Sequence, residues 1–148
     1  MPQISVRPIE TSDQAEWRRL WTAYLAFYET ELPDNIYAST WARLFTEGEY
    51  EPNGMLASVD GKPVGLVHYI FHRSCWSEEN YCYLQDLYAD PEARGKGVGR
   101  ALIEAVYAAA DSRGAARVYW MTQEFNHTAR LLYDRVAKKT PFIKYQRG

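Results

Sequence analysis

The sequence has no strong excess of charge of either sign and no basic run. Its 148 residues carry 17 Lys and Arg against 19 Asp and Glu, a formal net charge of −2. Proteins that neutralise nucleic-acid phosphates need a basic face, so this composition gives no electrostatic support for nucleic-acid binding. Long apolar runs are also missing, because the segment 105–110 is much too short to span a bilayer. The first residues, MPQISVR, contain no apolar signal region, so we expect a cytoplasmic protein.

Cysteine and histidine are scarce. The two cysteines, Cys75 and Cys82, flank an expected turn between strands. A disulfide across this turn is an open alternative, but the chain has no secretory features, and we interpret both as small apolar side chains. His68 and His72 fall in an expected strand, where four residues span roughly 13 Å. One metal ion cannot bridge that distance, so we predict no metal site.

What is present is the composition of an ordinary globular protein, with 47% hydrophobic and 24% charged residues. The length suits one domain over residues 1–148 with one sizeable core. Aromatic residues make up 15% of the chain and include twelve tyrosines, a surplus that also suits a ligand pocket.

Apolar periodicity and turn residues predict alternating elements. Helices are expected from the caps at 11–13 to Tyr28, over about 36–45, from Val98 to the C′ residue Gly114, and from the cap Asn126 through about 137. Strands are expected at 3–8, 55–59, 64–71, 81–89, 116–122 and 142–145, with a hairpin turn at 60–62. The order is strand, two helices, three strands, helix, strand, helix, strand.

The stretch from Leu84 to Arg100, LQDLYADPEARGKGVGR, carries the strongest functional signal. It reads as a buried strand, a glycine-rich loop with basic residues, and a helix that begins at the loop. Glycines let backbone N–H groups point inward, and the helix N-terminus adds unpaired donors and partial positive charge. We therefore expect a ligand with phosphate groups at this loop.

The glycine spacing separates the phosphate-binding motifs. A dinucleotide fingerprint requires Gly or Ala where the chain has Arg100 or Leu102, and a P-loop requires a Lys-Ser/Thr pair that is missing here. The remaining pattern is Arg94-x-x-Gly97-x-Gly99. By itself it also fits a simple glycine-rich turn, but the preceding strand and the following helix favour a binding site.

Arg94-x-x-Gly97-x-Gly99 resembles the pyrophosphate-binding signature of the GCN5-related N-acetyltransferases, which bind acetyl-coenzyme A. The tail VYWMTQEFNHTARLLYDRVAKKTPFIKYQR is similar to the fungal histone and polyamine acetyltransferases, and YLQDLYADPEARGKGVG to polyamine N-acetyltransferases. The resemblance covers essentially the whole chain. It implies an α/β fold with a mixed, mostly antiparallel twisted sheet of about six to seven strands and helices on both faces.

The resemblance also implies residues for acetyl-CoA. Backbone groups of Leu87, Tyr88 and Ala89 would bind the pantetheine arm. The pyrophosphate would be held by the loop and the start of the helix, that is by Arg94, Gly95, Lys96, Gly97, Val98, Gly99 and Arg100. The matching Asn126 would lie beside the pantetheine, although Asn126 also suits a helix cap. Arg94 and Arg100 also suit a solvated surface.

Tyr133 matches the tyrosine that the family uses as general acid near the sulfur, while its position on an amphipathic helix also fits a core aromatic. The general base is left open. Polyamine acetyltransferases carry Glu at the position of Gln85, and strand alternation would turn the neighbouring Asp86 to the opposite face. The remaining carboxylates that would act through water are Glu29, Glu31, Glu78, Glu79 and Glu124, and direct loss of the proton to solvent is a further alternative.

The acceptor pocket of the family lies between the first two helices and the hairpin before the central strand, which implies Tyr28, Glu29, Tyr37, Trp76 and Gln85. The implied function is acetyl transfer by direct attack in a ternary complex. The acceptor would be the primary amine of a small cationic molecule, polyamine-like or amino-acid-like, or a protein lysine. An acyl-CoA-binding sensor without catalysis is the alternative, and a nucleotide-binding protein is a third. The resemblance also implies a homodimer, formed through the C-terminal strand.

Overall fold

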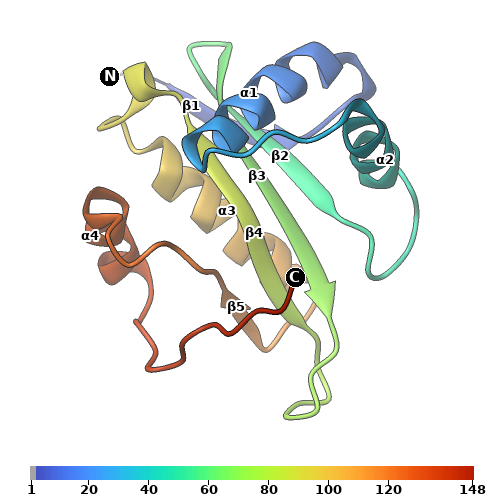
Figure 1. Ribbon diagram of the computed structural model, residues 1–148, viewed down its shortest axis with the longest axis vertical. Helices are drawn as coiled ribbons and strands as arrows, with labels where there is room; N and C mark the ends of the chain where they lie inside the picture. Colours follow the sequence, from blue (N-terminus) through green and yellow to red (C-terminus); the bar gives the residue numbers. More distant parts are fainter. Residues whose placement is uncertain (1–2) are drawn as a thin grey trace.

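The computed structural model describes residues 3–148 and shows a twisted sheet with helices on both faces (Figure 1). The strands are β1 (Ile4–Pro8), β2 (Asn53–Val59), β3 (Lys62–His72), β4 (Tyr81–Ala89) and β5 (Arg117–Tyr119). The helices are α1 (Gln14–Phe27), α2 (Asp34–Leu44), α3 (Val98–Ser112) and α4 (His127–Val136), with short 3-10 turns η1 (Thr11–Asp13) and η2 (Pro91–Ala93). Within the described residues no helix is long and apolar enough to cross a membrane.

The sheet is mixed, as expected. Its order is β1-β2-β3-β4-β5, and the first four strands are antiparallel, whereas β5 runs parallel to β4. The hairpin between β2 and β3 turns at Asp60 and Gly61, whose φ angles of 50° and 83° are both left-handed. Two left-handed residues match the right-handed twist of the flanking strands, so the expected hairpin is confirmed.

The prediction of a strand at 142–145 is wrong, and over residues 3–148 the sheet has five strands rather than the expected six to seven. The segment after α4 crosses in front of β4 and β5 without pairing to either (Figure 1). Its side chains Phe142, Ile143 and Tyr145 are 75% to 88% exposed. A segment with strand-forming residues becomes a strand only where a partner satisfies its backbone groups, and residues 3–148 supply no partner strand there.

Helices cover the two faces of the sheet (Figure 1). The apolar stripe of α3 packs on one face, where Leu102, Ile103 and Val106 are fully buried with Val67 and Phe71 of β3. On the other face Trp17, Leu20 and Trp21 of α1 pack with Leu56 and Leu66 of the sheet. The helical spacing of these residues explains both helices, because burial of one apolar stripe stabilises each of them.

A β-bulge in β4 determines what faces the α1 side. The register pairs His68 with Asp86 and Tyr69 with Leu84, so Gln85 is an extra residue without a partner on β3. The bulge interrupts the alternation of side chains: Leu84 and Leu87, three residues apart, both belong to the α3 side of the core. Asp86 lies opposite His68, beneath α1.

The cysteines are free. Cys82 is buried and Cys75 is exposed. The interpretation of Cys82 as a small apolar side chain is confirmed, whereas Cys75 lies on the surface of the β3–β4 connection.

Candidate functional site

The loop between β4 and α3 has the backbone of an anion site. Gly95 and Gly97 have left-handed φ angles of 81° and 88°, a conformation that side chains disfavour. Gly97 is the N-cap residue of α3, and no side chain caps the helix there. The N–H groups of the first helical turn, Val98 to Arg100, therefore have no partner within the helix.

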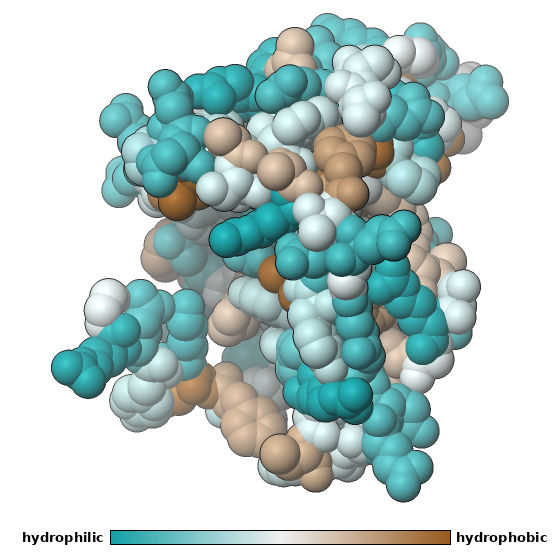
Figure 2. Space-filling model, turned by 90° about the vertical axis from the view of Figure 1, so that its right-hand side faces the viewer, coloured by the Kyte–Doolittle hydropathy of each residue, from teal (hydrophilic) through white to brown (hydrophobic). Residues whose placement is uncertain are grey.

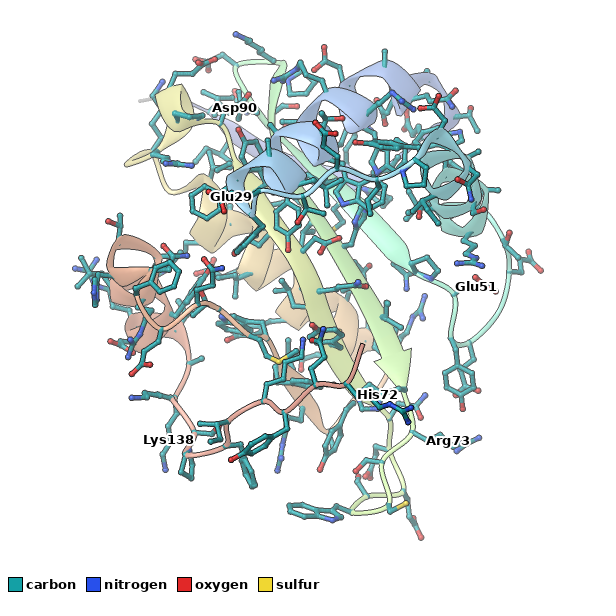
Figure 3. The ribbon with its side chains drawn as sticks, in the orientation of Figure 1. Glu29, Glu51, His72, Arg73, Asp90 and Lys138 are labelled. Carbon is teal, nitrogen blue, oxygen red and sulfur yellow. The ribbon has the colours of Figure 1, made fainter. Side chains whose placement is uncertain are left out.

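Two contacts fix this loop to the rest of the molecule. The carboxylate of Asp90 accepts hydrogen bonds from Nη1 and Nη2 of Arg19 on α1, and its Oδ2 lies 3.2 Å from both nitrogens. The backbone N–H of Asp90 donates to the carbonyl of Val64 at 2.8 Å. Figure 3 shows Asp90 just beyond the upper end of β4, beside α1. The end of β4 is held against β3 and α1, which places the start of α3.

The basic side chains of the loop are exposed. Arg100 Nε is 2.8 Å from Glu104 Oε1 one turn further along α3. Arg94 and Lys96 make no ion pair within residues 3–148. These two cations and the free N–H groups next to them are what a diphosphate requires.

Strands β4 and β5 separate beyond a short ladder. They pair only over Tyr81–Tyr83 and Arg117–Tyr119 within the described chain, so the β5-facing edge of Leu84 to Ala89 is free. A small cavity of about 20 Å³ lies at this opening. It is lined by side chains from α1, β4, the segment after β5 and α4, namely Tyr24, Tyr28, Leu84, Gln85, Leu87, Trp120, Met121 and Tyr133. We call it the β4–β5 cavity.

Tyr133 of α4 reaches the β4–β5 cavity and packs edge-on against Trp120, with ring centroids 5.5 Å apart. Burial raises the pKa of Tyr133 to about 12, and the neighbouring Tyr28 adds to the shift. The phenol therefore keeps its proton at neutral pH and can donate it. A Cβ atom on Gly99 would lie 3.3 Å from Leu132 Cδ2, so glycine lets α4 approach the start of α3.

A larger cavity of about 420 Å³ lies below α1 and α2. Its walls come from both helices, the segment before β2, β3 and β4, and comprise Trp21, Thr40, Arg43, Tyr50, Glu51, Pro52, His68, Ile70, Gln85 and Asp86. Figure 2, which views the α2 side, shows the surface hollowed below the upper mass of the molecule. We call it the α1–α2 cavity. Gln85 of the bulge lines both cavities, which places them next to each other.

Asp86 is held at the inner wall of the α1–α2 cavity by a buried chain of polar contacts. Its Oδ2 is 2.8 Å from His68 Nδ1, and His68 Nε2 is 3.0 Å from Trp17 Nε1. The side chains of His68 and Asp86 are 3% and 11% exposed. Trp21 Nε1 nearby is buried with no hydrogen-bond partner among the described residues, so the cavity wall contains a donor without an acceptor.

The structure brings together part of the expected set. Tyr28, Gln85, Leu87 and Tyr133 meet at the β4–β5 cavity. Tyr88 packs with the α1 side of the core, whereas Ala89 packs with the α3 side. Asn126 occupies the N-cap position of α4, but its side chain donates to Thr122 Oγ1 at 3.1 Å and makes no cap bond.

Three expected acceptor residues lie outside both cavities. Tyr37 is buried under α1, where its hydroxyl is 2.8 Å from Thr22 Oγ1. Trp76 is 74% exposed on the β3–β4 connection. Glu29 follows α1 in a left-handed conformation with its side chain at the surface, as Figure 3 shows. The other carboxylates considered as bases, Glu31, Glu78, Glu79 and Glu124, are exposed and line neither cavity within the described chain.

The sequence pattern places neither Asp86 nor His68 in the acceptor site: strand alternation turns Asp86 to the opposite face, and His68 suggests only a metal ligand, which its spacing from His72 excludes. Regular alternation would place Asp86 and Gln85 on opposite faces, but the bulge lets both side chains line the α1–α2 cavity. The expectation that Asp86 faces away from Gln85 is therefore wrong, because the bulge interrupts the alternation of side chains. The sequence carries no turn residue at 85 that signals a bulge, and only the pairing with β3 reveals it.

Comparisons with known proteins agree with this architecture. The sequence model of the Acetyltransferase (GNAT) family matches residues 14–137. The chain is 42% identical over 148 residues to the D-amino-acid N-acetyltransferase HPA3 of Saccharomyces cerevisiae, covering 99% of this chain and 91% of that protein. It is 30% identical over 84 residues to a thialysine N-epsilon-acetyltransferase of Caenorhabditis elegans, covering 57% and 52% of the two chains.

Among solved structures, the aminoglycoside N-acetyltransferase AAC(6')-Iy in complex with CoA superposes with a TM-score of 0.83. The two chains are 17% identical, and the match covers 100% of this chain and 96% of the other. At this identity the likeness concerns the fold.

Proposed function

The chain belongs to the Acetyltransferase (GNAT) family of N-acetyltransferases, and we propose that it transfers the acetyl group of acetyl-CoA to the primary amine of a small acceptor. The observation that carries the proposal is the adjacency of three features. These are the anion site at Gly95 and Gly97, the edge of β4 that β5 leaves unpaired, and the protonated phenol of Tyr133. The two cavities meet at Gln85, which lines both.

The residues present fit acetyl-CoA. Free N–H groups of Val98, Gly99 and Arg100, with Gly95, Gly97, Arg94 and Lys96, would hold the diphosphate. The unpaired edge of Leu87, Tyr88 and Ala89 would bind the pantetheine arm, together with Asn126 at the N-cap of α4. Bound acetyl-CoA supplies an activated thioester, and the chain binds and orients it.

Transfer to an amine in a ternary complex requires a proton for the departing thiolate. Tyr133 would be the proton donor at the β4–β5 cavity, and its raised pKa keeps the phenol protonated at neutral pH. Free backbone N–H groups on the edge of β4 would polarise the thioester carbonyl. Both groups belong to rigid elements, so they need no rearrangement during the reaction.

The α1–α2 cavity is the proposed acceptor site, and its lining favours an amino-acid-like molecule. Asp86 suits an ammonium group, while Arg43 and the unpartnered Trp21 Nε1 are donors that suit a carboxylate. The similar yeast protein is named for D-amino acids. Polyamines are the second candidate, because Asp86 and Glu51 are two carboxylates in one cavity.

An acceptor panel tests the proposal. Purified protein is incubated with acetyl-CoA and D-amino acids, L-amino acids, polyamines or a lysine peptide, and free CoA is followed with a thiol reagent. We expect acceptor-dependent release and an acetylated product by mass spectrometry. CoA binding without release for any acceptor would favour the sensor alternative, and binding of ATP or NAD as tight as that of CoA would favour a nucleotide-binding protein.

We also propose a homodimer that uses the C-terminal segment. Phe142, Ile143 and Tyr145 are exposed apolar side chains on an extended segment without a partner strand in residues 3–148. A second copy would cover them and satisfy the backbone groups. Light scattering should give twice the 17.2 kDa chain mass, and removal of residues 141–148 should give the monomer; a full-length monomer would contradict the dimer.

A further inference from the structure

Asp86 is a carboxylate in the wall of the proposed acceptor site, next to Gln85, which lines both cavities. So far it is only a partner for an ammonium group, and no proton transfer has been assigned to it. We propose that Asp86 binds the ammonium group of the acceptor and takes one proton from it, and that Trp17 fixes Asp86 for this role through His68. The inference rests on the proposed function, because it assigns the base of that same reaction.

The position of Asp86 follows from the bulge. Gln85 lines both cavities and Asp86, the next residue, lines the α1–α2 cavity opposite His68. An amine bound to Asp86 would therefore lie next to Gln85, and Gln85 lines the β4–β5 cavity together with Tyr133. The carboxylate is largely buried; its Oδ2 contacts His68 Nδ1, and Tyr24 on α1 is a second hydrogen-bonding neighbour of the carboxylate. Each carboxylate oxygen can accept more than one hydrogen bond, so Asp86 can still accept from an ammonium group.

The direction of the hydrogen bonds follows from elementary chemistry. The indole N–H of Trp17 only donates, so His68 Nε2, 3.0 Å away, must be the acceptor and carries no proton. The proton of the neutral ring is then on Nδ1, which donates to Asp86 Oδ2 at 2.8 Å. In this tautomer His68 cannot relay a second proton without losing the bond from Trp17. His68 is thus a positioning residue, and Asp86 is the group that accepts the proton.

Other groups that face Asp86 are mainly phenols. The negative charge of Asp86 contributes, after burial, to the raised pKa values of Tyr24 on α1, of Tyr28 directly after this helix and of Tyr83 on β4. Arg43 from α2 and Glu51 from the segment before β2 line the same cavity. Of the two carboxylates in this cavity, Asp86 is the one beside Gln85, which also lines the β4–β5 cavity, so Asp86 is the one placed to take a proton from the reacting amine.

The proton balance closes with these residues. The acceptor enters as RNH3+, and Asp86 takes one proton and later releases it to water. The neutral amine forms the C–N bond as the C–S bond breaks. The nitrogen then loses its second proton to water, while Tyr133 gives its proton to the thiolate and takes one back from water. The sum is one amide, one CoA thiol and one proton released per turnover.

The test compares Asp86→Asn with the wild type and with Asp111→Asn, the same change at an exposed carboxylate of α3 that lines neither cavity. At pH 7.5 we expect kcat/KM of Asp86→Asn to fall about a hundredfold, within the range for loss of acid–base catalysis, with CoA affinity unchanged. Asp111→Asn should behave as the wild type. Asparagine has the shape of aspartate and can still accept from His68, so folding should be preserved.

The pH dependence separates a base from a structural residue. Asp86→Asn must wait for acceptor that has already lost its proton in water. Its kcat/KM should therefore rise about tenfold per pH unit below the acceptor's own pKa, whereas the wild type rises much less. Parallel profiles for the two proteins, or a loss below about threefold at pH 7.5, would overturn the proposal. A wild type that acetylates no acceptor in the panel would instead refute the proposed function.

A second pair of variants tests the positioning by His68. His68→Asn keeps a donor near the place of Nδ1, and His68→Leu removes it. Turnover should survive better in His68→Asn, and 15N NMR of the wild type should show the Nδ1–H tautomer for His68. Equal turnover of the two variants, or the Nε2–H tautomer, would contradict the role of Trp17 and His68.

Discussion

A negative side chain at Gly97 should abolish CoA binding while a matched change at the other end of α3 should not. Gly97 and Gly114 both have left-handed φ angles, 88° and 68°, and a Cβ atom meets nothing closer than 3.8 Å at either position. The substitutions Gly97→Glu and Gly114→Glu therefore cost the same kind of backbone strain, about 1–2 kcal/mol. For a protein of this size each kcal/mol lowers Tm by about 2–4 °C.

The two variants differ in what the added charge faces. At Gly97 it meets two phosphate charges; at a separation of roughly 4 Å, each pair costs about 1 kcal/mol even in a water-like dielectric. The total of about 2 kcal/mol weakens CoA binding roughly thirtyfold before any steric block is counted. Gly114 lies beyond the far end of the 15-residue helix α3, about 22 Å away, which exceeds the Debye length of about 8 Å at physiological salt.

Calorimetric titration with CoA, together with thermal unfolding, checks this prediction. Both variants should unfold at lower temperature by similar amounts, and only Gly97→Glu should lose CoA affinity. Wild-type affinity in Gly97→Glu, or an equal loss in Gly114→Glu, would refute the assignment of the loop as the diphosphate site.

Three further predictions concern single groups. Tyr133→Phe should lower kcat more than tenfold with CoA affinity nearly unchanged, measured by steady-state kinetics and titration; unchanged kcat would remove its role as acid. Cys75 should react with a thiol reagent in the native protein and Cys82 should not, because burial raises the pKa of Cys82 to about 11 and shields it; mass spectrometry shows which site is labelled. Burial raises the pKa of Tyr133 to about 12 and also raises that of Tyr24, so their neutral forms favour the folded state; stability should hold below pH 10 and fall as the pH rises from 10 to 12, by about 2–3 kcal/mol for Tyr133. Chemical denaturation at pH 8 and pH 11 should show about half of this loss, about 1.4 kcal/mol for Tyr133, because pH 11 lies midway between the two pKa values; equal stability would contradict it.

Local patterns predicted much of the fold. Residues of α1 and α3 repeat at helical spacing, and Asp60-Gly61 specifies a hairpin by backbone conformation alone. Glycines at 95 and 97 adopt the left-handed conformations that the anion-site interpretation requires. Each of these features depends on neighbours within a few residues, which a single sequence contains.

Features that depend on distant partners were not predictable. The bulge at Gln85 exists only in the pairing of β4 with β3, and it decides that Asp86 and Gln85 share a cavity. The contact of Trp17 with His68 joins residues 51 positions apart. The segment 142–145 has the composition of a strand, but its backbone has no partner strand within the described part of the chain, residues 3–148. Tyr37 illustrates the same limit, because an aromatic residue expected at the acceptor site belongs to the core under α1.

A crystal structure of the protein with CoA tests the central claim most directly. The account predicts diphosphate oxygens about 3 Å from the backbone nitrogens of the first turn of α3, with the pantetheine along the open edge of β4 toward Tyr133. A diphosphate bound elsewhere, with residues 94–100 contacting no part of CoA, would contradict it.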